Sequence, residues 1–411
     1  IDEVHRAGAE SYLRVMDYFK PTFYLGMTAS PDRTDSFNIY ELFNNNIVYE
    51  VRLKEAMEND LLCPFHYFGI SDLEIDGQSI DELSDFSKLY SDKRVNHIID
   101  RINYYGYSGN RVKGLVFCSS KQEAKALSDE FNKRGFKTTS LTGEDSQERR
   151  EREVERLVAD SGDVLDYIFT VDIFNEGVDI PEVNQVVMLR PTQSAIVFIQ
   201  QLGRGLRKSK DKDFVVIIDF IANYKNNFLI PVALSGDNSY DKDTVRKFLS
   251  QGTRYLPGTS TIHFDEISKQ RIYSAIDNVK LNTWIFVATE YSKLKNKLGR
   301  IPTYYDFENY DALDIKKIFE VAGSYYTFLT KKERQFKYKG QLTKTAENML
   351  NFVSTNLILS KKIEELQILS LLLNDDMKNI EGQFKDIMLA EYNKFIADYE
   401  LEVSKKILTN N

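Results

Sequence analysis

Short apolar runs alternate with longer amphipathic segments between residues 114 and 220. The amphipathic segments have helical spacing, and the apolar runs have the length of buried strands: "GLVFC", "FKTTSL", "DYIFTV", "QVVML" and "FVVIID". Strands that are apolar throughout are typical of a parallel sheet that helices cover on both faces. The pattern therefore predicts an α/β fold, in which ligands bind beyond the carboxyl ends of the strands.

The helices predicted in this region carry signals at their ends. Ser120 and Glu123 have the spacing of a capping box, and Gly135 is placed to end the same helix. In the next helical segment, "DSQERREREVERLV", Asp145 and Glu148 put carboxylates in the first turn, where they suit the exposed amides. A third helix is expected over "TQSAIVFIQQLGRGLR".

The flanking regions have a different character. Residues 1–62 offer one helix ("AESYLRVMDYF"), one strand ("FYLGMTA") and a polar connection, which is too little for a sheet. Residues 256–266 read as an irregular linker, and the chain beyond them is helix-like. We therefore predict three regions: residues 1–62, a sheet-bearing region at 63–222 and a mainly helical region at 223–411.

Composition narrows the class of protein. A chain of 411 residues is long enough for two or three domains, and it lacks the run of roughly 20 apolar residues that a membrane span needs. Cys63 and Cys118 lie far apart, which fits a reducing cytoplasm. The net charge of -8 argues against coating of nucleic acid through bulk charge, although residues 293–300 and 331–339 are locally basic.

Four short segments carry the functional signal: "IDEVHRAG" (1–8), "MTASPDR" (27–33), "FTVDIFNEGVDIP" (169–181) and "QQLGRGLR" (200–207). In this order and spacing they resemble the Walker B (DEAH-type), III, V and VI motifs of superfamily 2 helicases. The resemblance implies that residues 1–62 are the carboxyl-terminal remnant of a first RecA-like domain and that residues 63–222 are the second. ATP and Mg²⁺ would bind between the two domains. The resemblance of "EGVDIP" to bacterial DNA-acting members favours DNA over RNA as partner.

The first two motifs imply the hydrolytic groups. By resemblance, Asp2 holds Mg²⁺, and Glu3 shares the metal site and polarises the attacking water. His5 couples this site to the motif III residues Thr28 and Ser30. Phosphoryl transfer requires such groups, because a metal must neutralise the phosphates and the water must be oriented. The alternative interpretation of Asp2 and Glu3 is a solvated acidic terminus.

The last two motifs imply groups that meet the nucleotide from the other side. Arg204 and Arg207 are three residues apart on an expected helix and therefore share a face. The resemblance brings both to the γ-phosphate, with Arg207 as the arginine finger. Gln200 would contact the nucleotide or the neighbouring domain, and Gly177 and Asp179 would lie near the ribose and the domain interface. A surface ion pair for Arg204 and a simple glycine turn at motif V remain alternatives.

Three hydroxyl residues match the positions that contact nucleic acid in the family. Ser119, Thr142 and Thr170 follow or end predicted strands. Small hydroxyls and exposed amides there can hold backbone phosphates without reading sequence. Each hydroxyl could equally cap a helix.

The phosphate-binding loop G-x-x-x-x-G-K-[ST] occurs nowhere in the 411 residues. We therefore expect that the chain begins just before its Walker B strand and that the loop belongs to an upstream segment of the same protein. This fragment should hydrolyse ATP poorly alone.

The carboxyl-terminal third carries weaker signals. Residues 290–307 and 323–329 resemble a helical domain of unknown function that is appended to some bacterial helicases. Residues 304–338 interleave Tyr and Phe with Lys and Arg. Such a segment suits either a surface that stacks bases in a single-strand channel or the core of a small helical bundle.

These observations predict a fragment of an ATP-dependent DNA helicase or translocase. Two alternatives stay open: the motor half of a restriction or phage-defence system, and a non-catalytic nucleic-acid-binding module that kept helicase architecture. The presence of both Glu3 and Arg207 argues against the second, because a scaffold needs neither half of a hydrolytic site.

Overall fold

The computed structural model describes residues 1–4, 7–19, 21–28, 37–51, 53–75, 78–79, 89–171, 180–190, 198, 203, 205–222, 224–251, 258–310, 312–357, 363–373, 380–392 and 394–409. The chain divides into two compact units, residues 1–279 with 295–301 and residues 280–294 with 302–411. The boundary expected at residue 222 falls inside the first unit.

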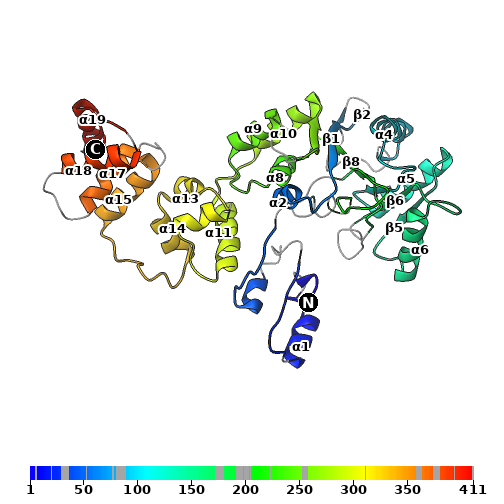
Figure 1. Ribbon diagram of the computed structural model, residues 1–411, viewed down its shortest axis with the longest axis horizontal. Coiled ribbons are helices and arrows are strands. Elements are labelled where there is room, and N and C mark those ends of the chain that lie inside the picture. Colours follow the sequence, from blue (N-terminus) through cyan, green and yellow to red (C-terminus); the bar gives the residue numbers. More distant parts are fainter. Residues whose placement is uncertain are drawn as a thin grey trace. The chain divides into compact units, whose positions relative to one another are not determined.

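In the described part of the first unit, seven parallel strands form one sheet in the order β5-β6-β4-β7-β8-β1-β9 (Figure 1). The strands are β1 (Phe65–Ser71), β4 (Gly114–Phe117), β5 (Thr138–Leu141), β6 (Tyr167–Thr170), β7 (Gln185–Met188), β8 (Val215–Ile221) and β9 (Thr261–Phe264). Every residue of β4, β6, β7 and β8 is buried, so both faces of the sheet are covered. The predicted α/β fold with a parallel sheet is therefore confirmed.

Two strands lie where the sequence did not indicate any. β1 pairs in parallel with β8 on one side and β9 on the other, with Tyr67 opposite both Ile217 and Ile262. β9 falls within the segment expected to be a linker, so that interpretation was wrong. The strand is short and lies at the sheet edge, and its flanking Gly and Pro residues concealed it. A separate antiparallel pair, β2 (Glu74–Ile75) and β3 (Gln78–Ser79), follows β1.

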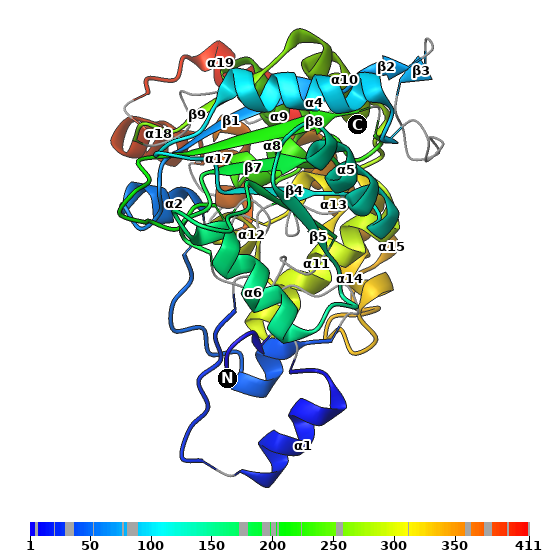
Figure 2. The ribbon, with the colours of Figure 1, turned by 90° about the vertical axis from the view of Figure 1, so that its right-hand side faces the viewer.

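Helices pack on the sheet of the first unit (Figures 1 and 2). These helices are α4 (Asp92–Tyr105), α5 (Lys121–Lys133), α6 (Gln147–Val158), α8 (Leu229–Ser235), α9 (Lys242–Gln251) and α10 (Glu266–Asn278). The Phe131 ring of α5 is fully buried and lies 5.0 Å from the Phe169 ring of β6. Burial of a ring of this size stabilises a fold by roughly 2–3 kcal/mol.

The caps of α5 and α6 differ slightly from expectation. Ser120 Oγ accepts from the Glu123 amide at 3.1 Å, as predicted, but the Glu123 carboxylate accepts from the amide of Ser119 instead of Ser120. In α6 the N-cap is Ser146, whose hydroxyl accepts from the Arg149 amide. Asp145 therefore precedes the helix.

The amino-terminal segment contains α1 (Glu10–Tyr18), the 3-10 helix η2 (Ile39–Phe43) and α2 (Leu53–Glu58). The helix expected at residues 9–19 is confirmed by α1. Residues 23–28 form no strand in the described chain, although the Met27 amide donates to the Ile1 carbonyl (2.9 Å) and the Val4 amide to the Met27 carbonyl (3.0 Å). A small core of Val4, Ala7 and Ile39 holds this segment together.

The second unit is mainly helical, as predicted. Its helices, of which α11 continues into the first unit, are α11 (Trp284–Leu298), α12 (Tyr304–Asn309), α13 (Ile315–Ala322), α14 (Tyr325–Lys332), α15 (Lys344–Phe352), the π-helix η4 (Val353–Leu357), α17 (Ile363–Leu373), α18 (Ile380–Tyr392) and α19 (Asp398–Thr409). Phe328 is fully buried, 5.0 Å from the Tyr291 ring. None of the helices described in either unit has the length and apolar character needed to cross a membrane.

Candidate nucleotide and nucleic-acid site

The three hydroxyl residues predicted to contact nucleic acid lie at the carboxyl ends of neighbouring strands. β6 lies between β5 and β4, and Thr170 is opposite both Leu141 and Phe117. Thr142 and Ser119 follow those two residues, so the three side chains collect at the carboxyl ends of adjacent strands. Ligands of open α/β sheets bind at this edge.

Ser119 is held by a neighbouring carboxylate. Its amide and its hydroxyl both donate to Glu123 Oε2, at 2.8 and 2.6 Å. A residue with both donors occupied has no proton left to offer a phosphate. The helix-start role that was left open for this residue fits the structure better than direct phosphate contact.

A buried charge cluster keeps Glu123 in place. Arg94 of α4 is 0% exposed and donates to Glu123 Oε1 at 2.9 Å and to Asp72 Oδ2 at 2.9 Å. Burial alone would lower the pKa of the Arg94 guanidinium, but Asp72 and Glu123 raise it. Because the loss of one partner would leave a buried charge uncompensated, Glu123 cannot easily release Ser119.

Thr142 is less exposed than Ser119 and more exposed than Thr170. Its amide and its hydroxyl both donate to Asp145 Oδ2, at 2.7 and 3.3 Å, so its donors are engaged as those of Ser119 are, and the side chain is half-buried. Arg149 pairs with Asp145 from the first turn of α6, and Arg150 donates to the Gly143 carbonyl at 2.9 Å. The turn after β5 thus places a half-buried threonine beside two arginines.

Thr170 is fully buried, and its Oγ1 has no hydrogen-bond partner within the described structure. A direct phosphate contact from this hydroxyl is therefore not what the structure presents. Burial follows from the position of Thr170 at the end of a central strand, which the sequence pattern alone could not distinguish from an exposed strand end.

The candidate hydrolytic carboxylates lie in the amino-terminal segment. Asp2 is exposed, and its Oδ1 accepts from the Glu3 amide at 2.9 Å. Glu3 has φ +47°, a left-handed conformation that is uncommon outside glycine. Thr28, predicted to couple to this pair, follows Met27, whose carbonyl accepts from Val4. Strained residues of this kind cluster at functional sites.

Arg207 is exposed on the segment that precedes β8. The adjacent Leu206 is buried, and its carbonyl accepts from the Cys63 amide at 2.7 Å, which ties this segment to the start of β1. The remaining predicted residues, His5, Ser30, Gly177, Asp179, Gln200 and Arg204, lie outside the described residues.

Lys212 is a residue that the sequence did not single out. It is 6% exposed, and its Nζ donates to the carbonyls of Pro181, Val183 (2.9 Å) and Gly205 (2.9 Å). Three acceptors match the three protons of an ammonium group. Lys212 therefore joins the end of the motif V segment to the motif VI segment. In "KSKDKD" it could not be told from solvated lysines.

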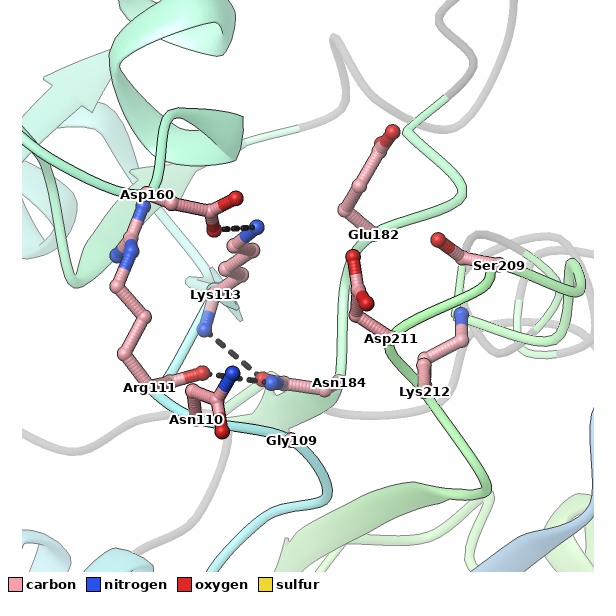
Figure 3. A pocket seen from close by; sticks show the side chains of 10 residues that line it. All are labelled: Gly109, Asn110, Arg111, Lys113, Asp160, Glu182, Asn184, Ser209, Asp211 and Lys212. Carbon is pink, nitrogen blue, oxygen red and sulfur yellow. Dashed lines mark hydrogen bonds and ion pairs between the residues drawn. The ribbon is translucent and has the colours of Figure 1, made fainter.

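A shallow pocket lies at the opposite, amino edge of the sheet (Figure 3). Its lining residues precede β4, β6, β7 and β8, and they include Lys212, Lys113 and Asn184. Several of its polar groups are engaged within the fold: Lys113 pairs with Asp160 at 2.7 Å, and Asn184 donates to the carbonyls of Ser108 and Arg111. This pocket is a structural junction and lies away from the edge that carries the motif residues.

The sheet also buries an acid. Asp219 in β8 accepts a hydrogen bond from the Tyr67 hydroxyl at 2.5 Å, and burial raises the pKa of Asp219 to about 7. The Tyr67 hydrogen bond acts in the opposite direction on that pKa but is the smaller effect.

Three parts of the chain match known protein families. Residues 93–209 match the helicase conserved C-terminal domain, residues 1–33 match the res subunit of type III restriction enzymes, and residues 287–411 match a domain of unknown function, DUF8090.

Curated relatives agree with these assignments. A Saccharomyces cerevisiae protein named as an ATP-dependent helicase, IRC3, is 28% identical over 54% of this chain and 33% of its own length. A 51.5 kDa Lactococcus phage protein is 24% identical over 54% of this chain and 48% of its own. A subunit of the Escherichia coli type I restriction endonuclease EcoAI is 25% identical over 54% of this chain and 31% of its own. The matched part thus spans a third to a half of these relatives.

Solved structures include an HsdR subunit fragment of a Vibrio vulnificus type I restriction enzyme (25% identity, 51% of this chain, 42% of that chain, TM-score 0.41). Another is the type ISP restriction-modification enzyme LlaBIII bound to DNA (14% identity, 99% of this chain, 31% of that chain, TM-score 0.42). Both TM-scores lie below 0.5, so we base no conclusion on them. Together these matches support a superfamily 2 helicase-type protein whose residues 93–209 are similar to the conserved C-terminal helicase domain and whose residues 287–411 are similar to DUF8090.

Proposed function

We propose that this chain is the carboxyl-terminal part of an ATP-driven motor that moves on nucleic acid, with DNA as the substrate. The observation that carries the proposal is the ordered set of helicase segments, which joins a carboxylate pair at residues 2–3 to an exposed arginine at residue 207 through a parallel sheet. The similarity to subunits of type III and type I restriction enzymes favours DNA as the substrate.

The hydrolytic roles follow from phosphoryl-transfer chemistry. Glu3 orients the attacking water, and Arg207, with Arg204, balances the charge that develops on the γ-phosphate. Gln200, Gly177 and Asp179 border the nucleotide, and His5, Thr28 and Ser30 couple hydrolysis to domain movement. An exposed Asp2 carboxylate beside Glu3 offers the hard oxygen ligands that Mg²⁺ prefers, and Mg²⁺ supplies charge neutralisation of the phosphates when bound.

The nucleic-acid role is best assigned to the turn after β5. Arg149 is exposed there, and Arg149 and Arg150 border the half-buried Thr142. Ser119 is exposed but its hydroxyl is engaged by Glu123, and Thr170 is buried, so we assign neither hydroxyl to a phosphate. Contacts of this kind hold phosphates and read no sequence.

An upstream segment with the phosphate-binding loop would complete the site. The amino-terminal segment exposes Tyr18 (81%), Phe23 (73%), Val48 (80%) and Tyr49 (76%), side chains that a complete domain usually buries. We infer that the first RecA-like domain covers this apolar surface and contributes the loop.

A role in restriction or defence against phage is the second candidate. It is favoured by the match of residues 1–33 to a restriction-enzyme subunit and by the similarity to EcoAI. The motor chemistry would be unchanged, and a nuclease would reside elsewhere in the complete protein.

The test is ATP turnover with and without single-stranded DNA, on this chain and on a form extended upstream through the phosphate-binding loop. The extended form should show DNA-stimulated turnover, and Arg207→Ala should lower it by roughly 10³-fold. Glu3→Gln should abolish most of it as well.

Matched controls exist for both variants. Lys208→Ala removes an adjacent exposed cation that pairs with Asp60, and Glu10→Gln removes a carboxylate that pairs with Arg14 on α1. Both should retain turnover within about twofold. Absence of DNA-stimulated turnover in the extended form would refute the motor proposal.

A further inference from the structure

The end of α14 and the segment after it concentrate positive charge in the second unit. The basic loop, which we define as residues 331–339 ("KKERQFKYK"), holds five cations and one carboxylate, Glu333. Glu333 Oε1 accepts from the Tyr291 hydroxyl at 2.9 Å, so this carboxylate faces the helical core. Lys331, Arg334, Lys337 and Lys339 are exposed. No Asp or Glu follows in the sequence until Glu347.

An aromatic scaffold shapes this loop. The Phe336 ring lies 5.7 Å from the Tyr326 ring and 5.8 Å from the Tyr338 ring. The Tyr326 hydroxyl donates to the Tyr338 carbonyl at 3.0 Å, and Gly340 turns the chain with φ +75°. These contacts fix the backbone on both sides of Tyr338.

Tyr338 itself points outward. Its side chain is 51% exposed, and Lys337 Nζ lies 5.4 Å from the centre of its ring. Phe319, Tyr325 and Phe328 are buried in the helical core, whereas Tyr304 and Tyr305 are exposed like Tyr338. The two interpretations of this segment therefore apply to different residues: some rings are core, whereas Tyr338 is a surface ring among cations.

We propose that the basic loop binds single-stranded nucleic acid, with Tyr338 stacking on a base while Lys337 and Lys339 contact the flanking phosphates. An exposed ring has a face for any base, and cations on both sides match the spacing of charge along a strand. An acidic protein would pair with the lysines but would gain little from Tyr338. This surface lies in the second unit and needs no ATP, so the proposal stands apart from the proposed motor activity.

The test is binding of the full chain, without nucleotide, to a labelled 20-nucleotide single strand, followed by fluorescence anisotropy at several salt concentrations. Tyr338→Ala should weaken binding about tenfold, and Tyr338→Phe should preserve it, because stacking needs the ring and not the hydroxyl. Lys337→Gln with Lys339→Gln should reduce the salt slope by about 1.4, because each phosphate that a lysine neutralises on a single strand contributes about 0.7 to that slope.

A control pair in the same unit is available. Lys385 pairs with Asp398, and Lys394 pairs with Glu364, so Lys385→Gln with Lys394→Gln gives the same change in charge away from the loop. This variant should keep the salt slope of the parent. Thermal unfolding of each variant checks that the fold is retained.

Two further readouts locate the contact and identify its chemistry. An oligonucleotide with 5-iodouracil should crosslink to Tyr338 under ultraviolet light, as mapped by mass spectrometry. DNA and RNA strands of one sequence distinguish the two sources of single strand, and polyglutamate serves as the acidic competitor. Absence of a crosslink within residues 331–339, with an unchanged salt slope, would overturn the proposal. Equal competition by polyglutamate, with no effect of Tyr338→Ala, would also overturn it and indicate a simple anion-binding surface.

Discussion

The amino-terminal segment and the sheet-bearing region each carry two of the four helicase motifs but differ sharply in burial. In the sheet, Phe131, Phe169 and Ile218 are each 0% exposed and belong to one continuous core. In residues 1–49 the buried set is limited to Val4, Ala7 and Ile39 among the described residues, while Phe23 is 73% exposed. A motif can therefore be intact in sequence where the surrounding core is incomplete.

The difference also separates what each region can do alone. The sheet has a core large enough to hold its edge residues in place, as the Arg94–Glu123–Ser119 network illustrates. The amino-terminal segment holds Asp2 and Glu3 mainly through a few backbone hydrogen bonds and a small apolar cluster. Its chemistry should depend on a neighbour, and that of the sheet should not.

The largest expected effect compares two phenylalanines. Phe131→Ala should destabilise the first unit by about 3–5 kcal/mol, because it leaves a cavity in the sheet core. Phe23→Ala should change stability by less than about 0.5 kcal/mol in this chain, since the ring is already in water. Labelling of the buried Cys118 thiol across a urea series measures both, because that thiol reacts only when the sheet opens.

The comparison of Phe131→Ala with Phe23→Ala gives a stricter test in the form extended upstream. There Phe23→Ala should become costly, by about 3 kcal/mol, if the first domain covers the ring. A negligible cost in both forms would break the comparison, because the exposed apolar surface would then have no partner.

A smaller effect concerns the pH dependence of the sheet. The pKa of Asp219 is raised to about 7 in the folded chain, against about 3.9 for an unfolded Asp. The folded state therefore binds more protons between these values, and stability from this group is full below pH 4 and falls as pH rises towards 7. The total change is about 4 kcal/mol.

Asp219→Asn should remove this dependence, which is measured as the difference between parent and variant free energies of unfolding at pH 4.5, 6 and 8. Tyr67→Phe is the matched control: it deletes the hydrogen bond that lowers the Asp219 pKa, so the decline should shift to higher pH. Parallel pH profiles for parent and Asp219→Asn would contradict the buried-acid interpretation.

Lys212 should contribute less to stability than Asp219 does. Its substitution tests how strongly this lysine holds together the segments of motifs V and VI. Lys212→Met leaves the carbonyls of Pro181, Val183 and Gly205 without a charged donor and should cost about 2 kcal/mol. Lys208→Met, at an exposed lysine four residues away, should cost less than about 0.5 kcal/mol. Urea unfolding of the two variants measures the difference, and equal costs would show that the three-carbonyl junction contributes nothing.

The sequence predicted what depends on local pattern and missed what depends on distant partners. The apolar runs predicted β4 to β8, because strands covered on both faces are apolar throughout. β9, at the sheet edge, alternates buried and exposed residues over only four positions and gave no such signal. The role of Ser119 was not readable, because Arg94 reaches Glu123 across 29 residues of sequence. For Arg204, Gln200, Gly177 and Asp179, the site stays a prediction.

The smallest expected effect tests the strained residue of the amino-terminal segment. Glu3 has φ +47°, which costs about 1 kcal/mol for a side chain with a Cβ and nothing for glycine. Glu3→Gly should therefore slow hydrogen exchange of the Val4 amide, which donates to Met27, by about fivefold. In the extended form the same variant should lose turnover, because glycine cannot orient water. Asn44→Gly relieves a left-handed residue of the same segment, at φ +54°, and should leave turnover unchanged. A stabilised segment that loses activity only at Glu3 would mean that the strain is retained for chemistry, whereas full turnover in Glu3→Gly would leave the strained residue without a function.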